Sequence, residues 1–517
     1  MQMQWTERRA PTYLEFRQEV RQYRPSDLIP ALARLSAALD RRSPTNRIRS
    51  DGTDMPWVVS AVARDSLIWG NEWRSATIDP RRLDALLRNF DRGGDLPEQP
   101  TIAEIVTPLL HEQFLYGESP FEEMCRVYAL MDAPGLGPSF DWPSIFGLEL
   151  REAVRASFVL RAWVAHNDGR FDATILDLPH FQEVFERIAP RPHIETVARA
   201  LTTTQGEARL AAAKAPPLDA VRQRYAFNPL VAHPLVDLGA AGTWAPQSML
   251  VDRALHPSNL YYRGIEVWGE RFARELGERV EAYAGKQLAL TAPAGTLTPE
   301  LEYRVRKETR KSVDWIWQTP RVTILIECKS ARMTLGARAG DGSITDVVAR
   351  SLGKGRRQLD ETARLIREQV TPFDRFRSDV PIVGVIVTAE PFYLANSRLA
   401  EYGNPSSIPS VVMSLRELEY WVTLPADDAV DALLATLNDE ERRTWAFGRA
   451  IGIKPGAPRN PILEEAWEQY AFIDVAGEAA AIDDGTAQRP LIRTSTDRNT
   501  WSDGLTERRQ QLLELRS

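Results

Sequence analysis

Three residues in the middle of the chain carry the side chains that hydrolysis of a phosphodiester bond requires. Asp314 lies 13 residues before Glu327, and Lys329 follows Glu327 after a single intervening residue. Mg²⁺ prefers oxygen ligands and is commonly held by one or two carboxylates together with water and substrate phosphate. Such a cation activates a water molecule, and a nearby ammonium group can hold that water and neutralise developing charge. We therefore expect a Mg²⁺ site, in which Mn²⁺ can substitute, with Asp314 and Glu327 as ligands.

Lysine is rare in this chain, which makes its position informative. Only seven of the 64 basic residues are lysines, and four of these seven lie between positions 307 and 354. The arginine side chain is planar and stays charged, whereas the lysine ammonium is flexible and has an adjustable pKa. A lysine at 329 indicates chemistry that arginine cannot supply, although chance in a small count is the alternative explanation.

A β-hairpin is the element that we expect to position these residues. Segments 313–317 and 322–329 are rich in apolar and β-branched residues and are separated by a four-residue loop. Hairpin pairing would bring Asp314 beside Glu327, where a buried charge is costly unless it is paired or metal-bound. Alternation along the second strand places Ile324, Ile326 and Cys328 on one face and Leu325, Glu327 and Lys329 on the other. The alternative is an ordinary sheet on which Glu327 and Lys329 form a solvent-facing ion pair.

The flanking sequence predicts a multidomain protein. Residues 1–250 have apolar residues three and four apart and predict a mostly helical region, with a connector over 214–246. Residues 257–424 alternate helical patterns with short apolar runs and predict a mixed α/β domain. Residues 425–517 predict a C-terminal appendage with a helix, irregular chain and a final polar helix.

Within the α/β domain, the elements can be assigned from periodicity. Helices are expected over 262–290 and 343–369, and strands over 301–305, 313–317, 322–329, 381–388 and 410–415. In the flanking regions, helices are expected over 28–39, 121–131, 148–165, 427–451 and 505–515.

These residues resemble the motif of the PD-(D/E)XK, or restriction-endonuclease-like, nuclease superfamily over about residues 257–424. Asp314 followed by Glu-Cys-Lys at 327–329 matches the motif, and Val313 replaces a proline that many members also lack. The resemblance implies an α/β restriction-endonuclease-like core, in which helices flank a mixed central sheet. It also implies a metal-dependent endonuclease.

The resemblance adds three residues to the expected site. Glu281 on the helix before the hairpin and Gln358 on the helix after it would join Asp314, Glu327 and Lys329 in the catalytic set. The backbone carbonyl of Cys328 would be a further metal ligand.

Positive charge gathers around this segment of an otherwise acidic chain. The net charge of the protein is −7, but residues 300–375 contain 16 Lys and Arg against 11 Asp and Glu, a net charge of +5. Such residues supply most of the non-specific affinity for nucleic acid. The expected nucleic-acid-binding residues are Arg304, Arg306, Lys307, Arg310, Lys311, Lys354, Arg356 and Arg357. The alternative for each cluster is a solvated charged face.

The sequence disfavours an ATP-hydrolysing, zinc-binding, secreted or membrane-integral protein. No GxxxxGK[ST] motif, CxxC pair, signal-peptide pattern or long apolar segment is present, so we expect a cytoplasmic protein with no membrane partner.

The favoured function is a metal-dependent DNA endonuclease of a bacterial restriction, defence or repair type. A catalytically silent nucleic-acid-binding or scaffold subunit and an RNA-cleaving nuclease remain alternatives. The N-terminal region would bind a target, a protein partner or a second copy of the chain.

Overall fold

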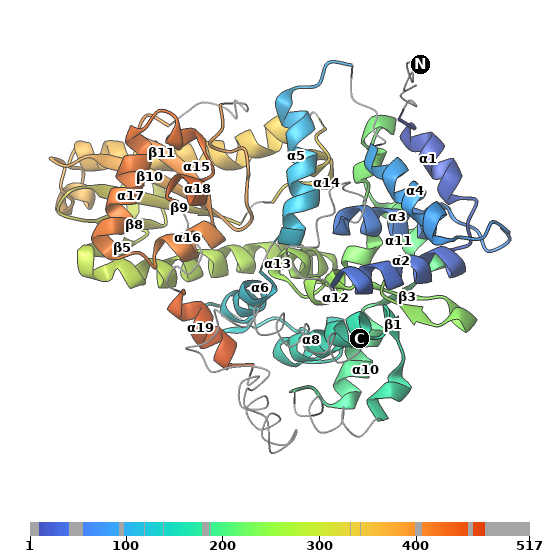
Figure 1. Ribbon diagram of the computed structural model, residues 1–517. Coiled ribbons are helices and arrows are strands. Elements are labelled where there is room, and N and C mark those ends of the chain that lie inside the picture. Colours follow the sequence, from blue (N-terminus) through green and yellow to red (C-terminus); the bar gives the residue numbers. More distant parts are fainter. Residues whose placement is uncertain are drawn as a thin grey trace.

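The structure is a computed structural model that describes most of the chain. It covers residues 10–40, 55–92, 98–117, 119–137, 139–177, 186, 188–330, 332–341, 343–398, 406–452 and 459–470. The protein is mostly helical, at 59%, with a helical N-terminal half and mixed sheets in its later part. Figure 1 shows helices α1 to α4 at one end, the larger sheet at the other, and the long helix α13 running between them.

The N-terminal half is helical, as its periodicity predicts. Its helices are α1 (Tyr13–Val20), α2 (Pro25–Asp40), α3 (Pro56–Trp69), α4 (Pro80–Arg92), α5 (Ile102–Gln113), α6 (Pro120–Arg126), α7 (Pro143–Phe146), α8 (Leu150–His166), α10 (Arg191–Ala200), α11 (Gln205–Lys214) and α12 (Met249–Arg253). Helices α1, α5 and α11 each begin with a capping box, in which a threonine and a glutamate three residues later satisfy each other's backbone N–H groups. The helix expected over 121–131 is α6 continued by a π-helical turn, Val127–Asp132.

A small sheet within this half was not expected from the sequence. It has the order β1-β4-β3-β2 and consists of β1 (Arg170–Phe171), β2 (Thr202–Thr204), β3 (Leu235–Asp237) and β4 (Thr243–Trp244). Two of these strands lie inside the expected connector, 214–246. Strands of two or three residues are too short to produce a recognisable alternation.

The later part contains a five-stranded mixed sheet with the order β11-β10-β9-β8-β5. Its strands are β5 (Thr296–Pro299), β8 (Trp315–Gln318), β9 (Thr323–Lys329), β10 (Ile382–Thr388) and β11 (Ser410–Ser414). The pairs β5–β8 and β8–β9 are antiparallel, and β9–β10 and β10–β11 are parallel. The expected hairpin is confirmed as β8–β9, and the expected strands at 381–388 and 410–415 are confirmed, whereas β5 was missed.

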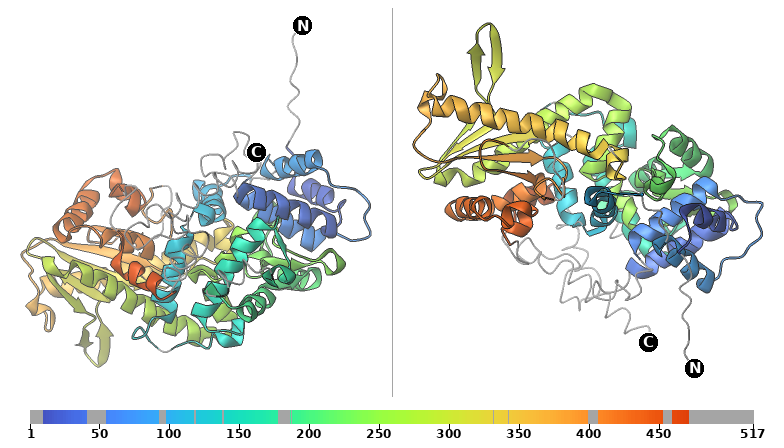
Figure 2. Two further views of the ribbon diagram at one scale, coloured as in Figure 1. Left: turned by 60° about the horizontal axis from the view of Figure 1, so that its bottom comes forward. Right: turned by 90° about the horizontal axis from the view of Figure 1, so that it is seen from above.

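Helices cover both faces of the central strands. Helix α13 (Pro257–Leu288) packs through Leu276 and Val280 into the core that contains Ile324 and Ile326 of β9. Helix α15 (Ser343–Arg367) packs against the opposite face, where Leu325 lies in a second core. Figure 2 shows α15 lying along this face. The face of β9 that carries Glu327 is therefore covered by a helix, and a solvent-facing ion pair is excluded.

The core on the α13 face continues into segments far away in the sequence. It combines residues of α6 and α8 with residues of α13, β9 and the C-terminal helices. Those helices are α16 (Leu415–Trp421), α17 (Ala426–Asn438), α18 (Phe447–Ala450) and α19 (Pro461–Glu468). The single helix expected over 427–451 is therefore divided into α17 and α18, and the helix expected over 505–515 lies outside the described residues. No helix in the described ranges is long and apolar enough to cross a membrane.

Candidate active site

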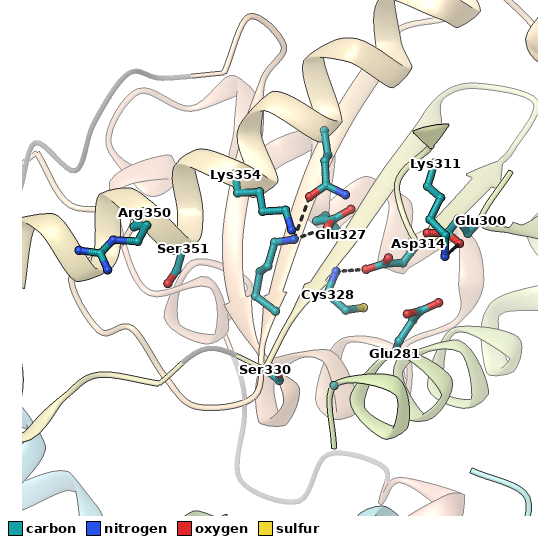
Figure 3. Close-up of a pocket in the computed structure, with 13 residues that line it drawn as sticks. Glu281, Glu300, Lys311, Asp314, Glu327, Cys328, Ser330, Arg350, Ser351 and Lys354 are labelled. Carbon is teal, nitrogen blue, oxygen red and sulfur yellow. Dashed lines mark hydrogen bonds and ion pairs between the residues drawn. The ribbon is translucent and has the colours of Figure 1, made fainter. Parts of the chain in front are cut away.

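The β8–β9 pairing brings the two predicted metal ligands together. Trp315 pairs with Ile326 in the antiparallel ladder, so Asp314, directly before β8, continues the register opposite Glu327. The backbone N–H of Cys328 donates a hydrogen bond of 2.6 Å to Asp314 Oδ2. Figure 3 shows the Asp314 and Glu327 side chains in one pocket. The short hairpin loop and the spacing of 13 residues together produce this juxtaposition.

Lys329 is held between the hairpin and helix α15. Its Nζ donates to Glu327 Oε1 and, over 2.9 Å, to Gln358 Oε1. Gly355 allows the helix to approach so closely, because a Cβ there would lie 3.2 Å from Ile386 and 3.5 Å from the Lys329 side chain. Gln358, which the resemblance placed in the site, therefore contacts Lys329 in the structure.

The carboxyl groups of the pocket are buried and incompletely compensated. Glu327 is 2% exposed, and burial, reinforced by the neighbouring Asp314, raises its pKa to about 8. Burial also raises the pKa of Asp314, although the Cys328 N–H and Lys329 oppose the shift. Glu327 Oε2 is buried and has no hydrogen-bond partner within the described part of the chain. An unpartnered buried oxygen beside a second carboxylate is an arrangement that a bound cation would satisfy.

The donor set suits Mg²⁺ better than a metal that is held by side chains alone. Among the residues that the structure describes, no group of three His, Cys, Asp or Glu side chains is arranged to hold a metal ion. Two carboxylates with additional water and phosphate ligands are typical of Mg²⁺. The N–H of Cys328 points toward Asp314, and N–H and C=O of one strand residue point the same way, so the Cys328 carbonyl faces this side of β9. The expected ligands thus fit such a cation.

Glu281 reaches the same pocket from the other side of the sheet. It lies on α13, and burial, followed by repulsion from Asp314, raises its pKa to about 7. Trp315 fixes this part of the helix, since its Nε1 donates over 3.1 Å to the Glu281 carbonyl. Its ring lies so close to α13 that a Cβ at Gly285 would be 2.0 Å from it. Trp315 is therefore a packing residue.

Besides the predicted Lys311, Lys354 and Gln358, the pocket contains residues that were not predicted from the sequence, among them Arg350 and Glu300. Arg350, Lys354 and Gln358 are spaced by four and line it along one face of α15. Gly277, Glu300, Lys311, Ser330 and Ser351 complete the lining. Arg350 could have been found by extending the helical spacing one turn back from Lys354. Glu300 lies before any recognisable motif, and only the fold places it here.

The expected nucleic-acid-binding residues are distributed unequally around the pocket. Lys311 and Lys354 line it, and Lys311 pairs with Glu300 over 2.7 Å. Arg356 is partly buried, Arg357 is exposed, and neither is a lining residue. The other four, Arg304, Arg306, Lys307 and Arg310, are exposed on a separate two-stranded hairpin of β6 (Glu302–Val305) and β7 (Glu308–Lys311). The expected strand at 301–305 is confirmed as β6, and β7 was missed.

Comparison of the chain with models of protein families, with curated proteins and with solved structures gave no match.

Proposed function

We propose that the protein is a metal-dependent nuclease that hydrolyses phosphodiester bonds, with DNA as the favoured substrate. One observation carries the proposal. Buried Glu327 lies beside Asp314 in a pocket lined by further cations; one of its oxygens is bonded to Lys329, and the other has no partner among the residues that the structure describes. The resemblance to PD-(D/E)XK nucleases supports the same reaction, and a role in bacterial restriction, defence or repair belongs to the same proposal.

The protein's own groups can be assigned roles in such a reaction. Asp314, Glu327 and the Cys328 carbonyl would hold Mg²⁺ or Mn²⁺, which would supply activation of water and stabilisation of charge on the phosphate. Lys329 can orient the attacking water and neutralise charge that develops on the phosphate oxygens. Gln358 holds the Lys329 ammonium in place. Glu281, next to Asp314, can hold a further water of the site.

The cations on the pocket face of α15 suit binding of the substrate backbone. Arg350 and Lys354 are exposed and lie one helical turn apart at the pocket. Contacts from such residues to phosphates position a nucleic acid without reading its sequence. The reacting phosphate would lie near Lys329, and neighbouring phosphates of the same strand would lie along α15.

The direct test is incubation of the protein with plasmid DNA, linear DNA and RNA in Mg²⁺, Mn²⁺ or EDTA. We expect cleavage of DNA that requires the divalent cation and is lost in Glu327→Gln. Glu368→Gln is a matched control, because Glu368 is on the same side of the sheet but outside the pocket, in an exposed ion pair with Arg364. Cleavage that persists in excess EDTA would contradict the metal mechanism. Binding without cleavage would favour a silent scaffold, and cleavage of RNA alone would favour the RNA-cleaving alternative.

A further inference from the structure

The β6–β7 hairpin is an arm that is separate from the five-stranded sheet. Its two four-residue strands pair from Glu302–Lys311 to Val305–Glu308 and form a sheet of their own. Figure 2, in the right view, shows this hairpin standing out from the body of the protein. We call residues 302–311 the arm.

The root of the arm is fixed to the wall of the candidate active site. Leu301 and Ser312 are joined by two hydrogen bonds of 2.9 Å, from Leu301 N–H to Ser312 Oγ and from Ser312 N–H to Leu301 O. The N–H of Val313 donates over 3.1 Å to Thr362 of α15. Lys311, at the end of the arm, lines the pocket itself. The arm therefore has a defined position relative to Asp314.

The two faces of the arm differ in their surroundings. Tyr303 is buried, and its ring packs against Phe373 at a centroid distance of 5.4 Å. Strand alternation places Arg304 and its partner Thr309 on the opposite face, and both are exposed. One face of the arm thus holds it against the protein, and the other is available to a ligand.

The tip of the arm keeps an arginine where glycine would fold more easily. Arg306 and Lys307 form the two-residue loop, and Arg306 has a φ of 57°. Glycine is the usual residue at such a position because it has no Cβ to cause strain. Strained residues that persist in a structure tend to mark functional segments. An arginine at this place is consistent with a binding role that outweighs the conformational cost.

The cations at the outer end of the arm differ from those near its root in their ion pairs. Arg310 pairs with Glu308, and Lys311 pairs with Glu300. By contrast, no ion pair joins Arg304, Arg306 or Lys307 to a carboxylate within the described ranges. The positive charge of the arm is therefore concentrated at its exposed tip and outer face.

We propose that the arm inserts into the major groove of B-form duplex DNA whose backbone lies at the candidate active site. This inference rests on the proposed function and specifies its substrate as double-stranded DNA. The B-DNA major groove is about 12 Å wide and about 8.5 Å deep, and it admits a two-stranded β-ribbon. The strands extend roughly 7 Å beyond the anchored Tyr303, and the loop with the long side chains of Arg306 and Lys307 adds the remaining reach to the base edges. The major groove of A-form RNA is deep and too narrow for such an element.

The test compares the wild type with an arm-tip variant, Arg306→Gly combined with Lys307→Ser. These residues suit a two-residue hairpin loop, so the fold should be retained while both charges are removed. Arg442→Gln combined with Arg443→Gln removes two charges from another exposed loop and serves as the control. Dissociation constants would be measured by fluorescence anisotropy for duplex DNA, duplex DNA with bulky C5 substituents on its pyrimidines, and duplex RNA. Each measurement would be made in Ca²⁺ and in EDTA.

We expect the arm-tip variant to bind duplex DNA about tenfold more weakly than the wild type, since a good arginine contact to a base edge contributes about that factor. The C5 substituents, which fill the major groove, should weaken the wild type similarly and leave the variant nearly unaffected. Binding of duplex RNA should be the same for both proteins. An arm-tip variant with unchanged DNA affinity, an equal loss on RNA, or a wild type that binds no duplex DNA would overturn the proposal. DNA binding that shows these differences without cleavage would support the role of the arm in binding and contradict only the nuclease function.

Discussion

Two buried glutamates show how differently this protein treats charge in its interior. Glu419 on α16 is 3% exposed and accepts hydrogen bonds from both Arg126, over 2.7 Å to Nε, and the Tyr283 hydroxyl, over 2.7 Å. Glu327 is 2% exposed, has Lys329 as its ion-pair partner and lies beside Asp314. The first carboxylate is fully partnered, whereas the second faces a neighbouring carboxylate and, among the described residues, has one oxygen without a hydrogen-bond partner.

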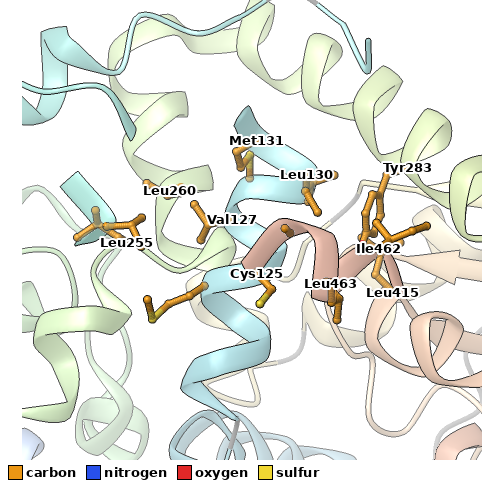
Figure 4. Close-up of a cluster of buried hydrophobic side chains, with 14 of the residues drawn as sticks. Cys125, Val127, Leu130, Met131, Leu255, Leu260, Tyr283, Leu415, Ile462 and Leu463 are labelled. Atoms are coloured by element: carbon orange, nitrogen blue, oxygen red, sulfur yellow. The ribbon is translucent and has the colours of Figure 1, made fainter. Parts of the chain in front are cut away.

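Glu419 belongs to a buried network of ion pairs around Arg126, and the surroundings of this network fit a structural role. Arg126 also pairs with Glu123, and Arg416 binds Glu123 over 2.9 Å. Burial favours the protonated form of Glu123, but the two arginines outweigh it and lower its pKa to about 2. Figure 4 shows a cluster of buried apolar side chains from α6, α13, α16 and α19, and Tyr283 of this cluster donates the hydrogen bond to Glu419. The comparison teaches that burial alone does not distinguish a candidate site carboxylate from a structural one, and that the degree of compensation does.

The largest effect is expected from substitution of the two neighbouring carboxylates of the pocket. Asp314→Ala and Glu327→Ala should each reduce cleavage by about a thousandfold or more, because loss of a ligand removes several kcal/mol of charge stabilisation. Folding should be retained, since removing one of two neighbouring carboxyl groups relieves repulsion in the metal-free protein. Plasmid cleavage and thermal melting would be measured together. Unfolding of both variants would indicate that these residues are structural.

For the network around Arg126, we expect a substitution to reduce the stability of the fold. Arg126→Met leaves Glu123 and Glu419 buried without their shared partner, and breaking such a pair costs about 3–5 kcal/mol. The free energy of unfolding from urea titrations should fall by that amount. Arg443→Met, at an exposed position, should change it by less than about 0.5 kcal/mol. A small effect of Arg126→Met would show that the network is not needed to hold α6 and α16 together.

Lys329→Arg should be impaired in turnover by about a hundredfold, a smaller loss than that of a metal ligand. The substitution keeps the positive charge, but the larger planar guanidinium displaces the water and alters the contact with Gln358. Single-turnover rates with saturating metal would be compared with those of Lys286→Arg, a partly exposed lysine outside the pocket. Near-normal turnover of Lys329→Arg would reduce the role of Lys329 to a general electrostatic one.

Glu327 should also make the free energy of unfolding depend on pH. The pKa of Glu327 is raised to about 8 in the folded, metal-free protein, so the folded state retains a proton that the unfolded state loses near pH 4.5. The stabilisation that the protonated Glu327 gives to the folded state is therefore complete below about pH 4.5 and is lost as pH rises through 8. Relative to Glu327→Gln, the wild type should lose stability over this window in EDTA. Parallel stability curves for the two proteins would contradict the raised pKa.

The sequence predicts those parts of the site that depend on short-range patterns. The apolar alternation and the short loop give the hairpin, which in turn positions Asp314, Glu327 and Lys329. Gln358 follows from a helical segment with clear periodicity. The domain boundary at 250–257 stays a prediction, and the apolar core on the α13 face contains residues from both sides of it.

Long-range contacts could not be predicted in the same way. Arg126 and Glu419 are 293 positions apart, and no local pattern links them. The covering of Glu327 by α15 depends on the way the helix packs over the sheet, which periodicity does not specify. Glu300 reaches the pocket through its pair with Lys311, a contact that only the geometry of the arm's root creates.

The most direct measurement is calorimetric titration of the metal-free protein with Mn²⁺ in buffers of different ionisation enthalpy at pH 7. We predict binding that is lost in both Asp314→Ala and Glu327→Ala and retained in Glu368→Gln. We also predict proton release on binding, because Glu327 is largely protonated at pH 7 when its pKa is about 8 and must ionise to act as a ligand. Binding that is unchanged in the two alanine variants, or no binding by the wild type, would contradict the assignment of this pocket as a metal site.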